Sequence, residues 1–201
     1  MLVFLKHRLV LLSMPKCGST ALETAFGRFA DVVITSTPQA KHTPFRKYDR
    51  FLRKYFETFT DCPLEVVCLF RDPVDWLGSW WRYRGRKELV GHENSTRGIS
   101  FEDFVGSYLD GEGAPARVGR QSQFVSNKAG EIGVDQIWRY DDLGGFADRL
   151  SQRLNVKMTV DRINVSPPSD GQTLSSDMAA RIKSELSRDF EIYQNLAKSA
   201  G

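Results

Sequence analysis

Short apolar runs alternate with longer amphipathic stretches along this chain. Runs too short for helices predict strands at Arg8–Ser13, Val32–Thr35, Val66–Phe70 and Gln136–Arg139. Helices are predicted between and after them, at Ser19–Phe29, Pro44–Phe56, Pro73–Lys87, Phe101–Leu109, Leu143–Leu154 and Ser176–Lys198. Because strands and helices alternate, we expect one three-layer α/β domain over residues 1–201, with a parallel sheet between two layers of helices.

The turn between the first predicted strand and its helix suits an anion. It reads Pro15-Lys16-Cys17-Gly18-Ser19-Thr20. The turn brings a lysine, a glycine and two hydroxyls to a helix N-terminus, where unpaired amides and the helix dipole favour negative charge. We therefore predict a phosphate-binding loop at Pro15–Thr20. The alternative is an ordinary strand-to-helix turn with a lysine on its surface.

A second strand-to-helix junction follows the run Val66–Phe70. Asp72 is a suitable N-cap and Pro73 suits the first helical position, so Arg71 stands at the strand end. Ser79 then lies about two turns into the helix. Arg71 offers a planar, permanently charged fork to a phosphate, and Ser79 adds a hydroxyl donor. The alternative is a capped helix in which Arg71 pairs with a neighbouring aspartate.

In their order and separation, these two segments resemble the 5′-phosphosulfate loop and the 3′-phosphate motif of sulfotransferases that use 3′-phosphoadenosine 5′-phosphosulfate (PAPS). The Walker P-loop does not fit, because Lys16 precedes Gly18 and Ser13 stands where its first glycine would be. Weaker resemblances are found at Arg139–Leu143 and Arg162–Ser166. The stretch from 85 to 133 matches least.

The resemblance implies a P-loop NTPase-like sulfotransferase architecture and a role for each motif. Pro15–Thr20 would hold the 5′-phosphate, with Lys16 neutralising the leaving oxygen. Arg71 and Ser79 would hold the 3′-phosphate of PAPS or of its product, adenosine 3′,5′-bisphosphate (PAP). No metal is required by this scheme, since positioning and electrostatics supply most of the catalysis in the related phosphoryl transfers.

The general base is expected to be His42, which follows the second predicted strand on the ligand side of the sheet. A histidine of ordinary pKa can accept a proton near neutral pH. The Lys41-His42 pair also resembles a segment that carries the base in some carbohydrate sulfotransferases. Glu93 and Asp110 are the alternatives. They lie in the Gly- and Ser-rich stretch from 85 to 133, which we expect to be a mobile cover over the acceptor.

The leading hypothesis is therefore direct in-line transfer of the sulfuryl group of PAPS to a hydroxyl or amine acceptor, a small molecule or a carbohydrate. One alternative is an ATP-dependent small-molecule kinase on a related fold. Another is a protein that binds PAP or a similar nucleotide without catalysis. Fold analogy does not decide among these, because function depends on the site.

Composition narrows the choice little. The chain has 201 residues, 41% of them hydrophobic and 26% charged, which is ordinary for a globular protein. Its formal net charge of +3 identifies no partner, although Arg82, Arg84, Arg86 and Lys87 form a basic cluster that could meet an acidic ligand or simply be a solvated helix end. Three cysteines lack any paired spacing. With no apparent leader or membrane span, we expect a cytoplasmic protein that binds no nucleic acid, its oligomeric state left open.

Overall fold

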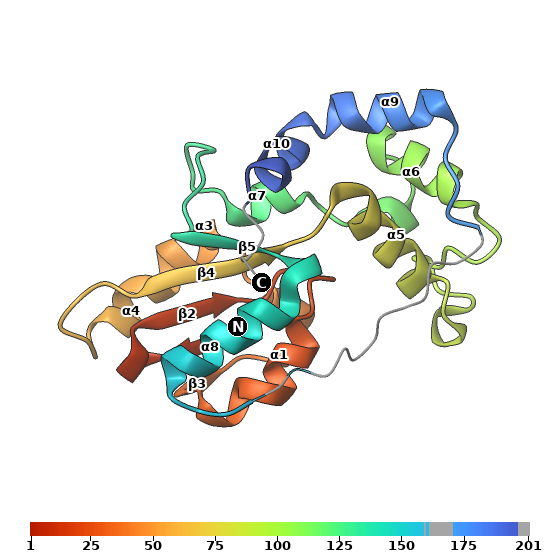
Figure 1. Ribbon diagram of the computed structural model, residues 1–201. Coiled ribbons are helices and arrows are strands. Elements are labelled where there is room, and N and C mark those ends of the chain that lie inside the picture. Colours follow the sequence, from red (N-terminus) through yellow and green to blue (C-terminus); the bar gives the residue numbers. More distant parts are fainter. Residues whose placement is uncertain (159, 161–170, 197–201) are drawn as a thin grey trace. The chain divides into compact units, whose positions relative to one another are not determined.

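The computed structural model describes residues 1–158, 160 and 171–196, and the chain divides into two compact units (Figure 1). The strand unit comprises the described residues of 1–71, 121–163 and 194–201, and the helical unit those of 72–120 and 164–193. The segment Arg162–Ser166, for which the sequence shows a weak family resemblance, lies outside the described residues.

The strand unit is built on a five-stranded mixed sheet of order β3-β1-β2-β4-β5. Its strands are β1 (Leu2–Phe4), β2 (Leu9–Leu12), β3 (Val32–Val33), β4 (Glu65–Phe70) and β5 (Gln136–Arg139). β2, β4 and β5 are parallel neighbours, whereas β1 runs antiparallel to both β2 and β3. The α/β class is therefore confirmed, but a wholly parallel sheet was the wrong expectation.

The antiparallel strand arises from a tight turn at the start of the chain. β1 leads into the 3-10 turn η1 (Leu5–His7), and Arg8 follows with φ 50°, so the chain reverses at once and pairs Phe4 with Leu9. Parallel neighbours need a long crossover, whereas an antiparallel pair needs only such a turn. β1 lies within the five-residue apolar run Met1–Leu5, which was not predicted as a strand from the sequence.

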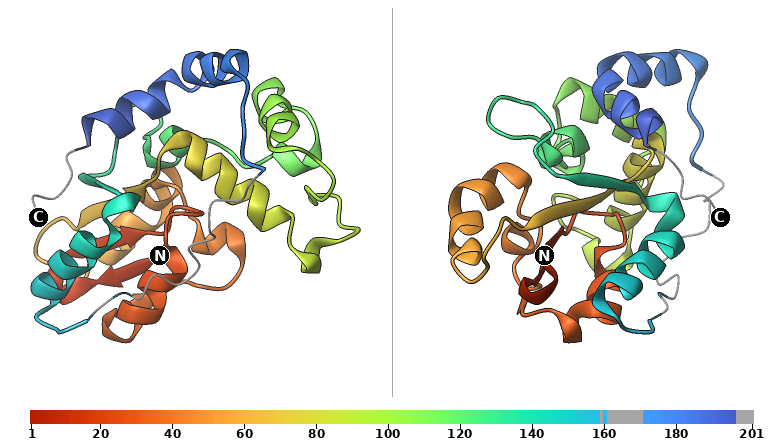
Figure 2. Two further views of the ribbon diagram at one scale, coloured as in Figure 1. Left: turned by 45° about the vertical axis from the view of Figure 1, so that its right-hand side comes forward. Right: turned by 60° about the vertical axis from the view of Figure 1, so that its left-hand side comes forward.

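Helices cover both faces of this sheet, with α1 and α8 on one side and α3 and α4 on the other (Figure 2). The helices and turns of the strand unit are α1 (Ser19–Phe26), η2 (Gly27–Phe29), α2 (Pro38–Lys41), α3 (Phe45–Tyr48), the π-helical η3 (Asp49–Arg53), α4 (Lys54–Glu57), α7 (Gln121–Val125), η6 (Tyr140–Asp142) and α8 (Leu143–Leu154). Phe4, Phe26, Tyr48 and Phe70 are fully buried in its core.

The elements of the helical unit are α5 (Pro73–Arg84), η4 (Lys87–Leu89), α6 (Phe101–Asp110), η5 (Ala114–Ala116), α9 (Ser176–Glu185) and α10 (Ser187–Asn195), the last two residues of which count with the strand unit. In the helical unit, α6 packs against both α5 and α9. The Trp81 ring packs against Phe101 at 5.7 Å between centroids, and its indole nitrogen donates to the Ile99 carbonyl at 2.9 Å. α5 and α6 begin where the sequence predicts, and α5 ends three residues earlier.

Candidate functional site

The loop between β2 and α1 has an unusual backbone. Lys16 and Gly18 have φ values of 64° and 73°, both in the left-handed region. Gly18 caps α1 without any side-chain hydrogen bond, and a Cβ there would lie 3.2 Å from the Tyr140 ring and 3.3 Å from Leu143. Only glycine fits that conformation and that space without strain. Since the first amides of an α-helix have no partner within it, this end of α1 can donate hydrogen bonds to an anion.

Arg71 is brought to the same edge of the sheet. β4 is the parallel neighbour of β2, so both strands end at one edge and Arg71, directly after β4, lies beside the loop. Its Nη1 donates to the Lys16 carbonyl at 3.0 Å, and its guanidinium lies 4.5 Å from the centroid of the Tyr140 ring. Two of the segments that the sequence singled out, Pro15–Thr20 and Arg71, are thus in direct contact.

Gln121 contacts both of these segments. It was not predicted from the sequence. Its Nε2 donates to the Arg71 carbonyl at 2.9 Å, and its Oε1 accepts from the Arg71 amide at 3.0 Å. The buried Cys17 thiol also donates to this Oε1, at 3.5 Å. A buried amide that pairs with two loops fixes their backbones. The Cys17 thiol is therefore part of this buried packing. No local sequence pattern distinguishes Gln121 from the polar residues around it.

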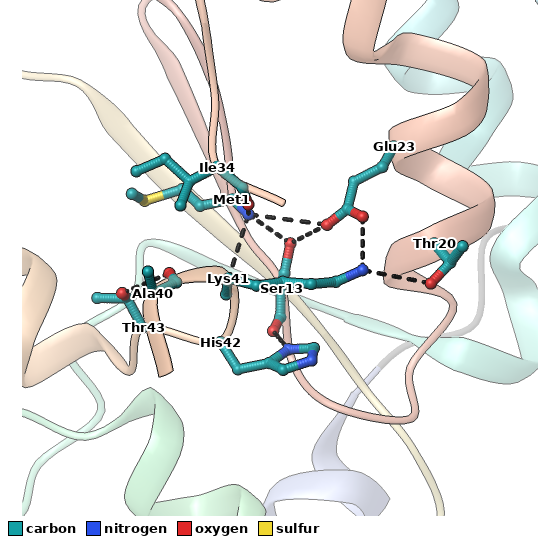
Figure 3. Close-up of polar contacts among 9 residues, drawn as sticks. All are labelled: Met1, Ser13, Thr20, Glu23, Ile34, Ala40, Lys41, His42 and Thr43. Atoms are coloured by element: carbon teal, nitrogen blue, oxygen red, sulfur yellow. Dashed lines mark hydrogen bonds and ion pairs between the residues drawn. The ribbon is translucent and has the colours of Figure 1, made fainter. Parts of the chain in front are cut away.

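His42 lies at the beginning of the loop. Its Nδ1 is 2.7 Å from the Ser13 carbonyl oxygen, and Figure 3 shows the second ring nitrogen turned away from that oxygen. Because a carbonyl only accepts, Nδ1 carries the proton in the neutral ring and Nε2 is left as an acceptor. Burial lowers the pKa of His42, while the hydrogen bond to Ser13 acts in the opposite direction. The ring is therefore neutral at pH 7 and equipped to accept a proton.

A buried carboxylate, Glu23, anchors a polar cluster beside the loop (Figure 3). Lys41 Nζ pairs with Glu23 Oε2 at 2.6 Å and donates to Thr20 Oγ1 at 3.3 Å. Ser13 Oγ donates to the other carboxylate oxygen at 3.1 Å and accepts from the Met1 nitrogen at 2.7 Å. Lys41 thus offsets a negative charge that would otherwise repel an anion bound at the loop, and also holds Thr20. The sequence offered one signal for this cluster, a lone carboxylate next to the apolar stripe of the first helix.

Ser79 belongs to the helical unit, where it lies on the half-buried side of α5. The start of this helix is as predicted: the Asp72 carboxylate accepts from the amides of Val74 and Asp75, both at 3.0 Å. These bonds satisfy two of the amides that a helix leaves unpaired. Asp72 thus acts as the cap of α5.

The two alternative bases also lie in the helical unit. Asp110 is ion-paired with Arg181 at 2.5 Å, at the end of α6. Glu93 is exposed in the turn that follows η4. The Asp110 carboxylate is engaged in this ion pair, whereas Nε2 of His42 is left as an acceptor by the hydrogen bond of Nδ1 to Ser13, so the local chemistry favours His42.

The basic cluster at the end of α5 is engaged within the helical unit. Arg84 Nη1 donates to the Ala114 carbonyl at 3.0 Å, and the Arg84 guanidinium lies 5.2 Å from the Trp80 ring. Arg86 lies 5.0 Å from the ring of Tyr83. These cations attach α5 to η5 and to its own aromatic side chains, which favours the structural interpretation of the cluster over a ligand-binding one.

Among the residues that the structure describes, no group of three or more histidine, cysteine, aspartate or glutamate side chains is arranged to hold a metal ion. Comparisons with known protein families, with curated proteins and with solved structures find no match for this chain. The functional assignment therefore depends on the geometry of the loop, Arg71 and His42, together with the resemblance of the two motifs.

Proposed function

We propose that this chain is a sulfotransferase that moves the sulfuryl group of PAPS directly to a hydroxyl or amine acceptor, with a carbohydrate among the candidate acceptors. The observation that carries the proposal is the contact of Arg71 with the left-handed loop Pro15–Thr20, at the edge where parallel strands β2 and β4 end. Ligands of α/β proteins bind beyond the carboxyl ends of parallel strands.

Each part of the loop has a separate task in this proposal. The amides around Cys17 and Gly18, with the hydroxyls of Ser19 and Thr20, hold the 5′-phosphate. Pro15 shapes the entry to the turn. Lys16 neutralises the bridging oxygen as the bond between sulfur and that oxygen breaks, so its effect is greatest in the transition state.

The 3′-phosphate is assigned to Arg71 and Ser79. A guanidinium binds a phosphate through two parallel hydrogen bonds, which gives affinity and orientation together. One N–H of Arg71 donates to the Lys16 carbonyl, and the guanidinium lies over the Tyr140 ring. These two contacts orient the Arg71 side chain before a ligand binds. Ser79 is assigned from the motif and lies on the helix that begins two residues after Arg71.

Proton transfer is assigned to His42. Its Nε2 accepts the proton of the acceptor hydroxyl while the oxygen attacks sulfur, and PAP leaves with the electron pair of the broken bond. The hydrogen bond from Nδ1 to Ser13 fixes the tautomer that this step needs. Because burial lowers the pKa of His42, the ring is in its neutral, proton-accepting form at physiological pH.

The test is turnover of PAPS with a panel of hydroxyl and amine acceptors, followed by chromatographic measurement of PAP. We expect PAP release above the rate without protein, and we expect Lys16→Ala to abolish it. Formation of ADP from ATP that depends on Lys16 would instead identify a kinase. Tight binding of PAP with no turnover for any acceptor, and no effect of His42→Ala, would identify a binding protein.

A further inference from the structure

A row of exposed aromatic side chains runs along the outer helix of the strand unit. Phe51, Tyr55 and Phe59 follow one another at a spacing of four residues, in η3, in α4 and in the turn after it. They are 62%, 61% and 60% exposed, and the rings of Tyr55 and Phe59 meet edge to face at 5.3 Å. We name these three residues the aromatic ridge; it spans roughly 12 Å at helical rise.

The ridge is not the core face of this helix. The buried residues of the same segment are Phe45, Tyr48 and Phe56, which lie against the sheet side of the helix. Tyr55 contacts the buried Phe56 ring at 5.6 Å between centroids, but more than half of each of the three ridge side chains remains exposed. Contiguous exposed apolar surface of this kind marks an interaction site.

Positive charge lies beside the ridge. Between Arg46 and Glu57 the chain carries five cations and two carboxylates, a net charge of +3 that equals the formal charge of the whole chain. Both carboxylates are engaged: Asp49 pairs with Arg53 at 2.9 Å, and Glu57 accepts from the Leu64 amide at 3.2 Å. Lys47, Arg50 and Lys54 are exposed, and Arg50 lies over the ring of Phe51 at 4.9 Å.

We propose that this face docks the protein onto an anionic lipid surface. A negatively charged lipid surface complements the exposed cations beside the ridge, whereas a two-fold dimer through the ridge would bring together two surfaces that both carry net positive charge. Aromatic side chains prefer the headgroup level of a bilayer, and lysine and arginine beside them attract anionic lipids. Among the described residues no helix is long and apolar enough to cross a membrane.

The test is flotation of the full chain with vesicles of phosphatidylcholine alone and of phosphatidylcholine mixed with phosphatidylglycerol. We expect binding at least about tenfold stronger to the mixed vesicles, decreasing as salt is added. Phe51→Ser/Tyr55→Ser/Phe59→Ser and, separately, Lys47→Glu/Lys54→Glu should each reduce this binding at least about tenfold. Val90→Ser/Ile132→Ser and Lys128→Glu/Lys183→Glu, at exposed positions elsewhere, are the matched controls and should bind normally.

Several results would overturn the proposal. One is equal binding to both kinds of vesicle, or binding to neither. Another is unchanged vesicle binding by the serine triple variant, and a third is an equal loss of vesicle binding in the control variants. Self-association that the triple variant abolishes would show that a second copy occupies the ridge. Binding to an acidic polysaccharide or to RNA, with none to vesicles, would assign it to another partner. PAP affinity, measured on the same variants, should stay unchanged, so this proposal fails or stands separately from the proposed catalytic function.

Discussion

The two helices that follow neighbouring parallel strands begin in opposite ways. α1 follows β2 and starts at Gly18, in a left-handed conformation and without a side-chain cap. α5 follows β4 and starts at Asp72, whose carboxylate accepts from the amides of Val74 and Asp75. A helix end closed by its own carboxylate repels an anion, whereas an open one attracts it. In the proposed site, backbone amides of α1 therefore bind the 5′-phosphate, whereas anion binding after β4 depends on the Arg71 side chain.

Among the variants compared in the following paragraphs, the largest effect is expected for loss of the proposed general base, His42. His42→Ala should lower the transfer rate about 10²–10⁴-fold, the usual contribution of a positioned general base. PAP affinity should be unchanged, because in the proposed reaction the ring contacts the acceptor and not PAP. The measurement is steady-state PAP formation alongside PAP titration. His92→Ala, at an exposed histidine of the helical unit, is the control and should retain full activity. A fall in PAP affinity in His42→Ala would remove its assignment as the base.

Gly18→Ala should damage the open helix end itself. The new methyl group meets Tyr140 and Leu143, and the left-handed conformation costs about 1–2 kcal/mol in the free energy of unfolding. PAP binding should weaken with it, because the amides that face the anion move. Gly27→Ala is the matched control. Gly27 ends α1 in a right-handed conformation with no atom within 4 Å of the new Cβ, so this change should stabilise the protein slightly or leave it unaltered.

Urea unfolding and calorimetric PAP titration check both glycine variants. If Gly18→Ala bound PAP as the unaltered chain does, the backbone of this loop would not form the anion site. Equal destabilisation by Gly27→Ala would show that the effect concerns α1 as a whole.

Asp72→Ala removes the cap of the closed helix end. The expected cost is about 1 kcal/mol in the free energy of unfolding, and Ser100→Ala, which removes the corresponding cap of α6, should cost a similar amount. Neither change should diminish the preference for PAP over AMP, because neither alters α1 or the Arg71 side chain. Denaturation curves and nucleotide titrations test this. Loss of the preference in Asp72→Ala alone would mean that the cap helps to position the 3′-phosphate site.

The smallest expected effect is a pH dependence of stability from His42. Its pKa is lower in the folded chain than in the unfolded chain, because burial disfavours the charged ring. The unfolded chain therefore binds more protons as pH falls through about 6.5, and the folded state loses stability there. His42→Gln should lose less stability between a pH of about 7 and a pH of about 5. Identical pH profiles for the two proteins would contradict this.

Local patterns were sufficient for most elements of the fold. β5 and α8 have the predicted bounds, β2 lies one residue inside the predicted range at each end, and Asp72 caps α5 as its residue type suggests. β1 was missed because the short apolar run Met1–Leu5 shows no alternation of apolar and polar residues. The strand order and the direction of β1 depend on pairing between distant segments, which no local pattern contains.

The candidate site, like the fold, was predictable only where local sequence patterns determine it. That the loop and Arg71 lie at the same edge of the sheet was predictable, because each follows an apolar run that forms one of two parallel strands. Gln121 contacts Arg71 across 50 positions and Cys17 across 104, and such contacts depend on how the strand unit packs. Tyr140, which fills the space beside Gly18, was noticed only as part of a weak motif.

The central claim is that the loop and Arg71 together form a site for a nucleotide with both a 5′- and a 3′-phosphate. The most direct measurement is calorimetric titration of PAP and AMP into the unaltered chain and into Arg71→Ala. We predict at least about tenfold tighter binding of PAP by the unaltered chain, and a loss of about 1.5–3 kcal/mol of PAP binding in a variant that remains folded. In Arg71→Ala the two affinities should be nearly equal. Equal affinities in the unaltered chain, or an undiminished preference in the variant, would contradict the claim.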